Sequence, residues 1–114
     1  MIASDAAGTI LVLTTLPSSE EAQRFVKRLV DERLVACGTV VENVTSVYRW
    51  EGKVETATEA QVILKTQRLR WDDLLRAVKR LHPYDVPELV ALPIETGLQA
   101  YLDWVGSETT ELQG

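Results

Sequence analysis

The sequence predicts an α+β fold of the ferredoxin-like type, in which βαββαβ is followed by an additional C-terminal helix and the strands form a four-stranded antiparallel sheet. Apolar, β-branched runs alternate along the chain with amphipathic helical patterns. Two of these runs are joined by a short glycine-containing turn, as in a hairpin. With 114 residues, 46% of them apolar, the chain has material for one core. We therefore predict a single domain over 1–114, with a core at about 9–106 and short flexible termini.

The first strand and helix are expected in residues 9–34. The run TILVLTTL is apolar at consecutive positions, which favours a strand buried on both faces. Ser18 and Glu21 then have the spacing of a capping box, whose side chains satisfy free backbone N–H groups at the start of a helix. Apolar residues follow at helical spacing, so this helix should lay one stripe on a sheet: Ala22, Phe25, Val26, Leu29 and Val30.

A long hairpin is expected next. Residues 36–50 alternate in character, with Val44, Ser46, Tyr48 and Trp50 on one face, and WEGKVE supplies a reversal before the second arm at 54–66. Arms of this length exceed the usual strand of about five or six residues. We therefore expect the distal part of the hairpin to extend beyond the helices and to meet a partner chain.

The C-terminal half repeats the pattern of helix, strand and helix. In RWDDLLRAVKRLH, one face carries Trp71, Leu74, Leu75 and Val78, with acidic residues in the first turn and basic residues in the last, as the helix dipole prefers. The run ELVALPI then predicts a strand, and its Pro93 favours a sheet edge. Apolar residues at 98, 101, 102 and 105 predict a short closing helix.

The two central strands predict self-association. They are apolar at consecutive positions in 10–13 and 62–64, yet two helices can cover only one face of the sheet. The uncovered face would be an apolar patch of a size that monomers rarely expose. We expect other copies of the chain to cover it in a closed homo-oligomer.

Composition excludes several classes of partner. The net charge is −5 and no basic patch is concentrated in the sequence, so neither nucleic acid nor an anionic membrane is expected. The longest apolar runs are far short of the roughly 20 residues of a membrane span. The N-terminus lacks the pattern of a secretory signal peptide, so we expect a cytoplasmic protein.

Few residues are candidates for metal binding or proton transfer. Cys37 is the single cysteine and cannot form an intrachain disulfide; a lone cysteine opening a strand is more often a small buried residue than a metal ligand. His82 is the only histidine and lies on the apolar stripe of its helix. Two interpretations remain open for it. It either ends the helix and bonds a backbone carbonyl, or it serves as a ligand or proton-handling group at a subunit interface.

No catalytic set is evident, and we expect the protein not to be an enzyme. The Ser18-Ser19 pair is explained as a helix cap, and the scattered glycines form no phosphate-binding loop. A hydrolase or transferase that uses His82 with Glu59 or Glu88 remains an alternative. Glu59 shares a strand face with Gln61, Ile63 and Lys65, where polar groups could line a cleft between subunits.

Three segments, YRWEGK, ILKT and HPYDVPE, occur in an order and spacing that resemble the CutA divalent-cation tolerance family, and the resemblance runs from about 10 to 105. It implies a homotrimer similar in assembly to the PII signalling proteins, with sheets facing inward and long hairpins reaching across neighbours. It also implies a role in tolerance of divalent metals, with copper binding in some members and no accepted catalytic reaction.

The resemblance also indicates where ligands would lie. The copper ligands of the family, a cysteine near the end of the first strand and a double histidine, correspond here to Thr14, Leu81 and His82. Only one imidazole is kept, and a lone imidazole is a weak copper site. No cofactor is certain, and copper or another divalent metal is the candidate, with His82 and then Cys37 as the candidate ligands. A metal ion or small ligand is expected in inter-subunit clefts lined by Tyr48, Trp50, Glu59, Lys65, Tyr84 and Glu88. The alternative is a highly stable trimeric scaffold, or a PII-like signalling module, without metal binding.

Overall fold

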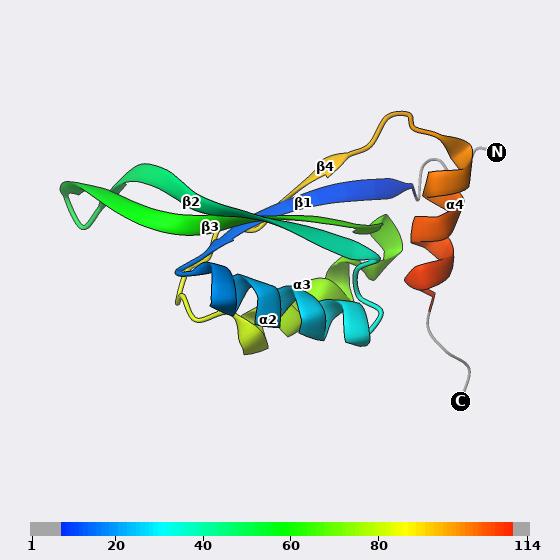
Figure 1. Cartoon of the computed structure of the whole chain (residues 1–114), viewed down its shortest axis with the longest axis horizontal. Helices are drawn as coiled ribbons and strands as arrows, with labels where there is room; N and C mark the ends of the chain where they lie inside the picture. The colour runs from blue at the N-terminus through cyan, green and yellow to red at the C-terminus, as the bar shows by residue number, and fades with distance from the viewer. Residues whose placement is uncertain (1–7, 111–114) are drawn as a thin grey trace.

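The computed structural model describes residues 8–110 and confirms the predicted α+β class and order of elements (Figure 1). The predicted flexible termini fall in 1–7 and 111–114, outside the described residues. The elements are β1 (Thr9–Leu16), α2 (Ser19–Asp31), β2 (Cys37–Trp50), β3 (Lys53–Gln67), the short 3₁₀ helix η1 (Arg68–Arg70), α3 (Trp71–Leu81), β4 (Val90–Pro93) and α4 (Gln99–Glu108). Within 8–110, no helix is both long and apolar enough to cross a membrane.

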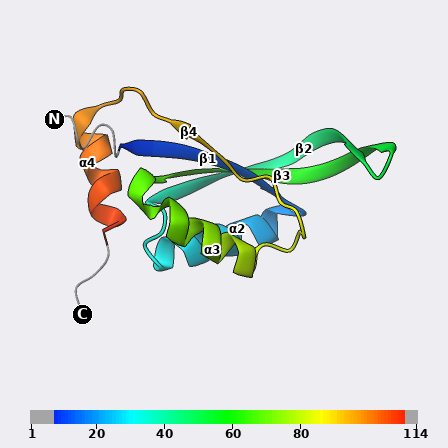
Figure 2. The same ribbon diagram turned by 180° about the vertical axis from the view of Figure 1, so that it is seen from behind.

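The four strands form one antiparallel sheet in the order β2-β3-β1-β4. Both α2 and α3 lie against the same face of this sheet, and α4 stands at one end of it (Figures 1 and 2). β4 pairs only with β1, with Pro93 opposite Ile10. The predicted edge position of Pro93 is therefore confirmed, because a residue without an N–H is tolerated where no further strand has to be bonded.

The core lies between the sheet and the two helices. Alternate residues of β1 and β3 are buried against the helices, among them Val12 and Leu64, and Phe25, Leu29 and Leu74 come from the other side. The opposite, open face of the sheet is only partly covered within the single chain: Leu11, Leu13 and Ile63 have intermediate exposure there. The strands are thus fully buried on one face, and burial of the other face by further copies stays a prediction.

Both helices present slightly different stripes from those predicted. Val30 was expected in the core but is 38% exposed, because it lies about 80° around the helix axis from Ala22 and so at the margin of the stripe. In α3 the buried face is Leu74, Ala77 and Val78, so Ala77 replaces the predicted Leu75. The predicted cap is confirmed: the Ser18 hydroxyl accepts the Glu21 backbone N–H at 3.2 Å.

The hairpin of β2 and β3 gives the molecule its longest dimension, 48 Å, and its distal part extends past the helices as predicted (Figure 1). Glu51 and Gly52 form its two-residue turn, both with positive φ, as a tight hairpin requires. A bulge near Asn43 adds one residue to β2, because Val41 lies opposite Gln61 and Val44 opposite Glu59. This extra residue keeps Val44, and the distal residues that alternate with it, on the open face.

Candidate functional site

The only histidine lies where β1, α2 and the end of α3 meet. His82 caps α3, and its backbone N–H donates to the carbonyl of Val78 at 2.8 Å. Its side chain is turned inward and only 8% exposed, with the ring of Phe25 edge-on at a centroid distance of 5.5 Å. Nε2 lies 2.9 Å from the carbonyl oxygen of Thr15 and 3.2 Å from Oγ1 of Thr14.

These contacts define the protonation state of the imidazole. A carbonyl oxygen can only accept, so Nε2 carries a proton and donates to Thr15. The backbone N–H of Tyr84 donates to Nδ1 at 3.1 Å, so that nitrogen offers its lone pair. Burial lowers the pKa of His82, although the bond to Thr15 and the nearby Glu59 carboxylate oppose the shift. The predicted helix-ending role with a bond to a backbone carbonyl is confirmed, and the ring is neutral.

Glu59 and Tyr84 form a second part of the site, next to the histidine and on the open face. The Tyr84 hydroxyl donates to Oε2 of Glu59 at 2.6 Å, and the rings of Tyr84 and His82 lie 5.0 Å apart. The nearby hydroxyls of Ser46 and Thr15 also favour the ionised form of this carboxylate. Burial would raise the pKa of Glu59, but these hydrogen bonds and His82 together lower it below its usual value.

The result is an ionised carboxylate with hydroxyl groups beside it, which we call the Glu59 cluster: Thr15, Ser46, Glu59 and Tyr84. Burial, followed by the bond to Glu59, raises the pKa of Tyr84, so its phenol stays protonated and continues to donate. Tyr48 lies on the same face of the hairpin and adds a smaller electrostatic contribution to that shift. The sequence predicted Glu59, Tyr84 and Tyr48 for this site, but not the hydroxyls of Thr15 and Ser46.

Lys65 belongs to a different group at the other end of the open face. It lies opposite Cys37 in the sheet, and its Nζ is 6.0 Å from the centre of the Tyr101 ring. The Tyr101 hydroxyl is 3.5 Å from Sγ of Cys37, and this bond together with burial raises the pKa of Tyr101 to about 12. Lys65 lies six positions from Glu59 along β3, which is about 20 Å along the strand.

One chain therefore does not bring all the predicted cleft residues together. Trp50 is the last residue of β2 before the hairpin turn and is 49% exposed, and Glu88 is exposed between α3 and β4. Tyr101 was predicted only as an apolar residue of its helix. Its contact with Cys37 depends on how α4 docks against the sheet, which no local pattern shows.

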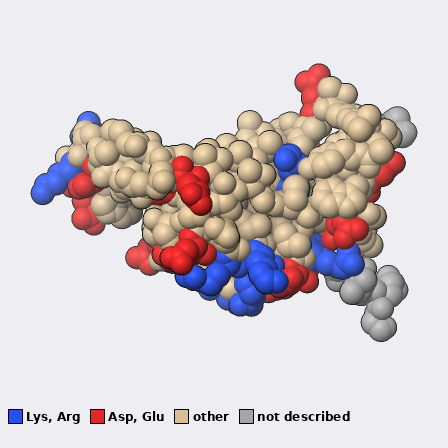
Figure 3. All heavy atoms as spheres, in the orientation of Figure 1, with Lys and Arg blue, Asp and Glu red and all other residues tan. Residues whose placement is uncertain are grey.

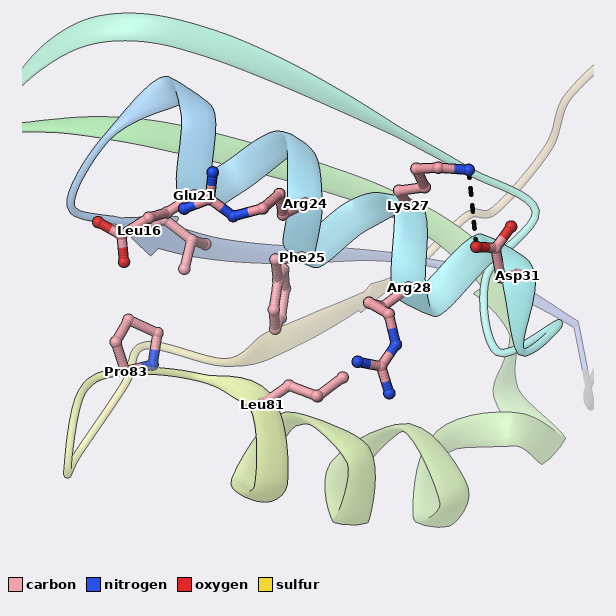
Figure 4. A pocket seen from close by; sticks show the side chains of 9 residues that line it. All are labelled: Leu16, Glu21, Arg24, Phe25, Lys27, Arg28, Asp31, Leu81 and Pro83. Atoms are coloured by element: carbon pink, nitrogen blue, oxygen red, sulfur yellow. Dashed lines mark ion pairs between the residues drawn. The ribbon is translucent and has the colours of Figure 1, made fainter.

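The donors around His82 do not fit copper. Both ring nitrogens are already engaged in hydrogen bonds, and Thr14 contributes a hydroxyl where a thiolate would favour that metal. The Leu81 side chain points into a groove between α2 and α3 (Figure 4). Across residues 8–110, no group of three or more His, Cys, Asp or Glu side chains is placed to hold a metal ion. Metal ligation by His82 or Cys37 stays a prediction without support from this geometry.

Comparisons with known proteins agree on one family. Residues 10–108 match the family model described as the CutA1 divalent ion tolerance protein. The divalent-cation tolerance protein CutA of Thermus thermophilus is 48% identical over 99 residues, covering 87% of this chain and 96% of that protein. Its relative from Pyrococcus horikoshii is 42% identical over 100 residues, covering 88% of this chain and 97% of that protein.

Solved structures show the same likeness. The divalent cation tolerance protein of Thermus thermophilus superposes with a TM-score of 0.87 at 46% identity, covering 90% of this chain and 99% of that one. The structure of the periplasmic divalent cation tolerance protein CutA from Archaeoglobus fulgidus gives 0.86 at 38% identity, with 90% and 99% coverage.

Proposed function

Because this chain belongs to the CutA1 divalent ion tolerance family, we propose that it is a non-catalytic, homotrimeric protein that responds to divalent cations, with its ligand site on the open sheet face. The observation that carries this proposal is the Glu59 cluster. A carboxylate kept ionised on a face that other copies would cover can attract a cation there. The names of the relatives support divalent-cation tolerance as the general role.

The open face supports the trimer. Leu11, Leu13 and Ile63 are incompletely covered in the single chain, and the distal hairpin exposes Val47 at 65% and Val54 at 63%. Each leucine or valine that is fully removed from water contributes about 1.5–3 kcal/mol. A rotationally symmetric ring of copies would bury all of these residues without leaving an open edge.

The chemistry of the cluster favours hard cations. Its donors are one carboxylate and three hydroxyls. Oxygen donors suit Mg²⁺, Mn²⁺ or Ca²⁺, whereas copper prefers nitrogen and sulfur. One carboxylate makes a weak site in a single copy, so the proposed cation gains its remaining ligands from neighbouring copies.

Sedimentation and calorimetry test the proposal together. We expect a trimer at micromolar concentration, and binding heats for Mn²⁺ that disappear in Glu59→Gln but persist in the matched variant Glu20→Gln, whose side chain is exposed on α2, on the helix side of the sheet. A stable monomer would overturn the assembly. Equal heats in the two variants would overturn the site, and Cu²⁺ heats lost only in His82→Ala would move the site to the histidine.

The alternative function, a stable trimeric scaffold or PII-like module without metal binding, is favoured by the way His82 and Glu59 bond to groups of their own chain. Absence of heat with every cation, together with a stable trimer, would select it. The same bonding argues against the alternative hydrolase or transferase, because neither nitrogen of His82 is free to accept a proton from a substrate. A cytoplasmic location remains part of the proposal.

A further inference from the structure

On the side of the molecule opposite the open sheet face, a groove of about 440 Å³ runs between α2 and the end of α3 (Figure 4). Apolar side chains form its floor: Leu16, Phe25, Leu81 and Pro83. Charged side chains of α2 form its rim: Glu21, Arg24, Lys27, Arg28 and Asp31. Association through the open face would leave this α2–α3 groove accessible, because the groove opens on the helix side of the sheet.

The cations of the rim are incompletely neutralised. Lys27 pairs with Asp31 at 3.7 Å, but Arg28 and Arg80 share the single carboxylate of Glu32, at 3.3 and 3.2 Å. Among residues 8–110, Arg24 makes no ion pair. Lys and Arg side chains are conspicuous over α2 (Figure 3), although the whole chain carries a net charge of −5. The five charged side chains of the rim, three cations and two carboxylates, carry a net charge of +1 on a chain whose net charge is −5, so the rim favours an anionic partner.

The spacing of the arginines indicates the form of that partner. Arg24 and Arg28 are four residues apart on α2, about 6 Å along the helix axis. Alternate side chains of an extended peptide recur at about 6.8 Å on one side, which matches this spacing. The intervening side chains point to the other side, where the floor offers Phe25 and Leu81. The lining residues follow α2 from Glu21 to Asp31, so the groove is elongated, as suits an extended peptide (Figure 4).

We propose that the α2–α3 groove binds an extended acidic peptide segment of a partner protein, in which carboxylate side chains alternate with apolar ones. The carboxylates pair with Arg24 and Arg28, and the apolar side chains rest on the floor. Peptide recognition in this form combines charge complementarity with hydrophobic anchoring. The proposal does not depend on the Glu59 cluster, because the groove lies on the other side of the sheet.

His82 provides a reporter for occupancy of the groove. Phe25 forms part of the floor, and its ring contacts the only imidazole of the chain edge-on. A ligand that displaces the ring of Phe25 therefore shifts a single, unambiguous histidine signal in an NMR spectrum of the full-length protein.

The experiment titrates the labelled protein with a peptide of alternating glutamate and leucine. We expect shifts along α2 and at His82, and at least tenfold weaker binding to Arg24→Glu than to the wild type. The matched variant Lys79→Glu makes the same charge change at an exposed position outside the groove and should bind normally. Affinity should also fall as salt is added.

Several outcomes would overturn the proposal. These are no binding at millimolar peptide, equal binding of a lysine–leucine peptide, or equal effects of Arg24→Glu and Lys79→Glu. Decanoate binding as tightly as the peptide would assign the groove to small organic anions instead. Shifts of groove signals that depend on protein concentration, without any peptide, would assign it to a second copy of the chain.

Discussion

The internal bonding of His82 gives a quantitative prediction for the substitution His82→Phe. Phenylalanine keeps a ring of similar size against Phe25 but can neither donate to the Thr15 carbonyl nor accept the Tyr84 N–H. Each unmade bond to a buried group costs about 1–3 kcal/mol, and since both bonds are only partly buried we take about 1 kcal/mol for each. The expected loss in the free energy of unfolding is therefore about 2 kcal/mol.

A graded variant separates the two bonds. His82→Gln keeps an N–H that can reach the Thr15 carbonyl but lacks the acceptor for Tyr84, so its loss should be about 1 kcal/mol. Urea denaturation of the three proteins at one fixed protein concentration measures these differences, because the stability of an oligomer depends on concentration.

Metal removal completes the experiment. If His82 acts only through its own chain, EDTA should leave the stability of the wild type unchanged. A loss in His82→Phe of less than about 0.5 kcal/mol would refute the hydrogen-bond argument, since the substitution leaves two polar groups without partners. A wild type that EDTA destabilises as much as the substitution does would show that the histidine holds a metal.

Three further predictions concern pH, packing and the Glu59 cluster. Folding lowers the pKa of His82 below 6.5, so the unfolded chain binds this proton more readily than the folded protein does. The melting temperature should therefore be highest above pH 6.5 and fall at lower pH, and it should fall less in His82→Phe. Folding also lowers the pKa of Glu59 below 4.5. This carboxylate therefore stabilises the folded protein above pH 4.5, and the stabilisation is lost as the pH falls through the pKa of the folded state. Gly38→Ala places a Cβ 2.6 Å from a side-chain atom of Val26 and should lower the free energy of unfolding by about 1–3 kcal/mol, as measured by calorimetry. An unchanged free energy of unfolding would mean that α2 moves away freely. Tyr84→Phe removes a donor to Glu59 and should raise the pKa of that carboxyl in an NMR titration; an unchanged value would mean that Ser46 and Thr15 suffice.

The features predicted correctly depend on local chemistry. Strand and helix periods, the Ser18 cap and the edge position of Pro93 each follow from what a few consecutive residues can bond or bury. The helix-ending role of His82 belongs to the same group, because a histidine at the end of an apolar stripe has backbone carbonyls within reach.

The features that were missed depend on how distant segments meet. The bulge at Asn43 is set by the register between β2 and β3, and the burial of Ala77 by the rotation of α3 on the sheet. The contact between Thr14 and His82 joins residues 68 positions apart. The predicted cleft residues fall into two separate groups for the same reason. The alternation of side chains along a strand shows which face of the sheet a residue lies on, but not how far it lies from other residues on that face.

The bulge at Asn43 also restricts how the hairpin can change in length. Successive residues of a strand point to opposite sides, so one inserted residue inverts every side chain beyond it. The single extra residue near Asn43 sets the phase of the whole distal arm of β2 and hence the side on which Tyr48 and Trp50 appear. Insertions or deletions in this arm should therefore be tolerated in pairs, or where a second irregularity restores the phase, while Asn43, at a φ of +56°, can be replaced by glycine at little cost.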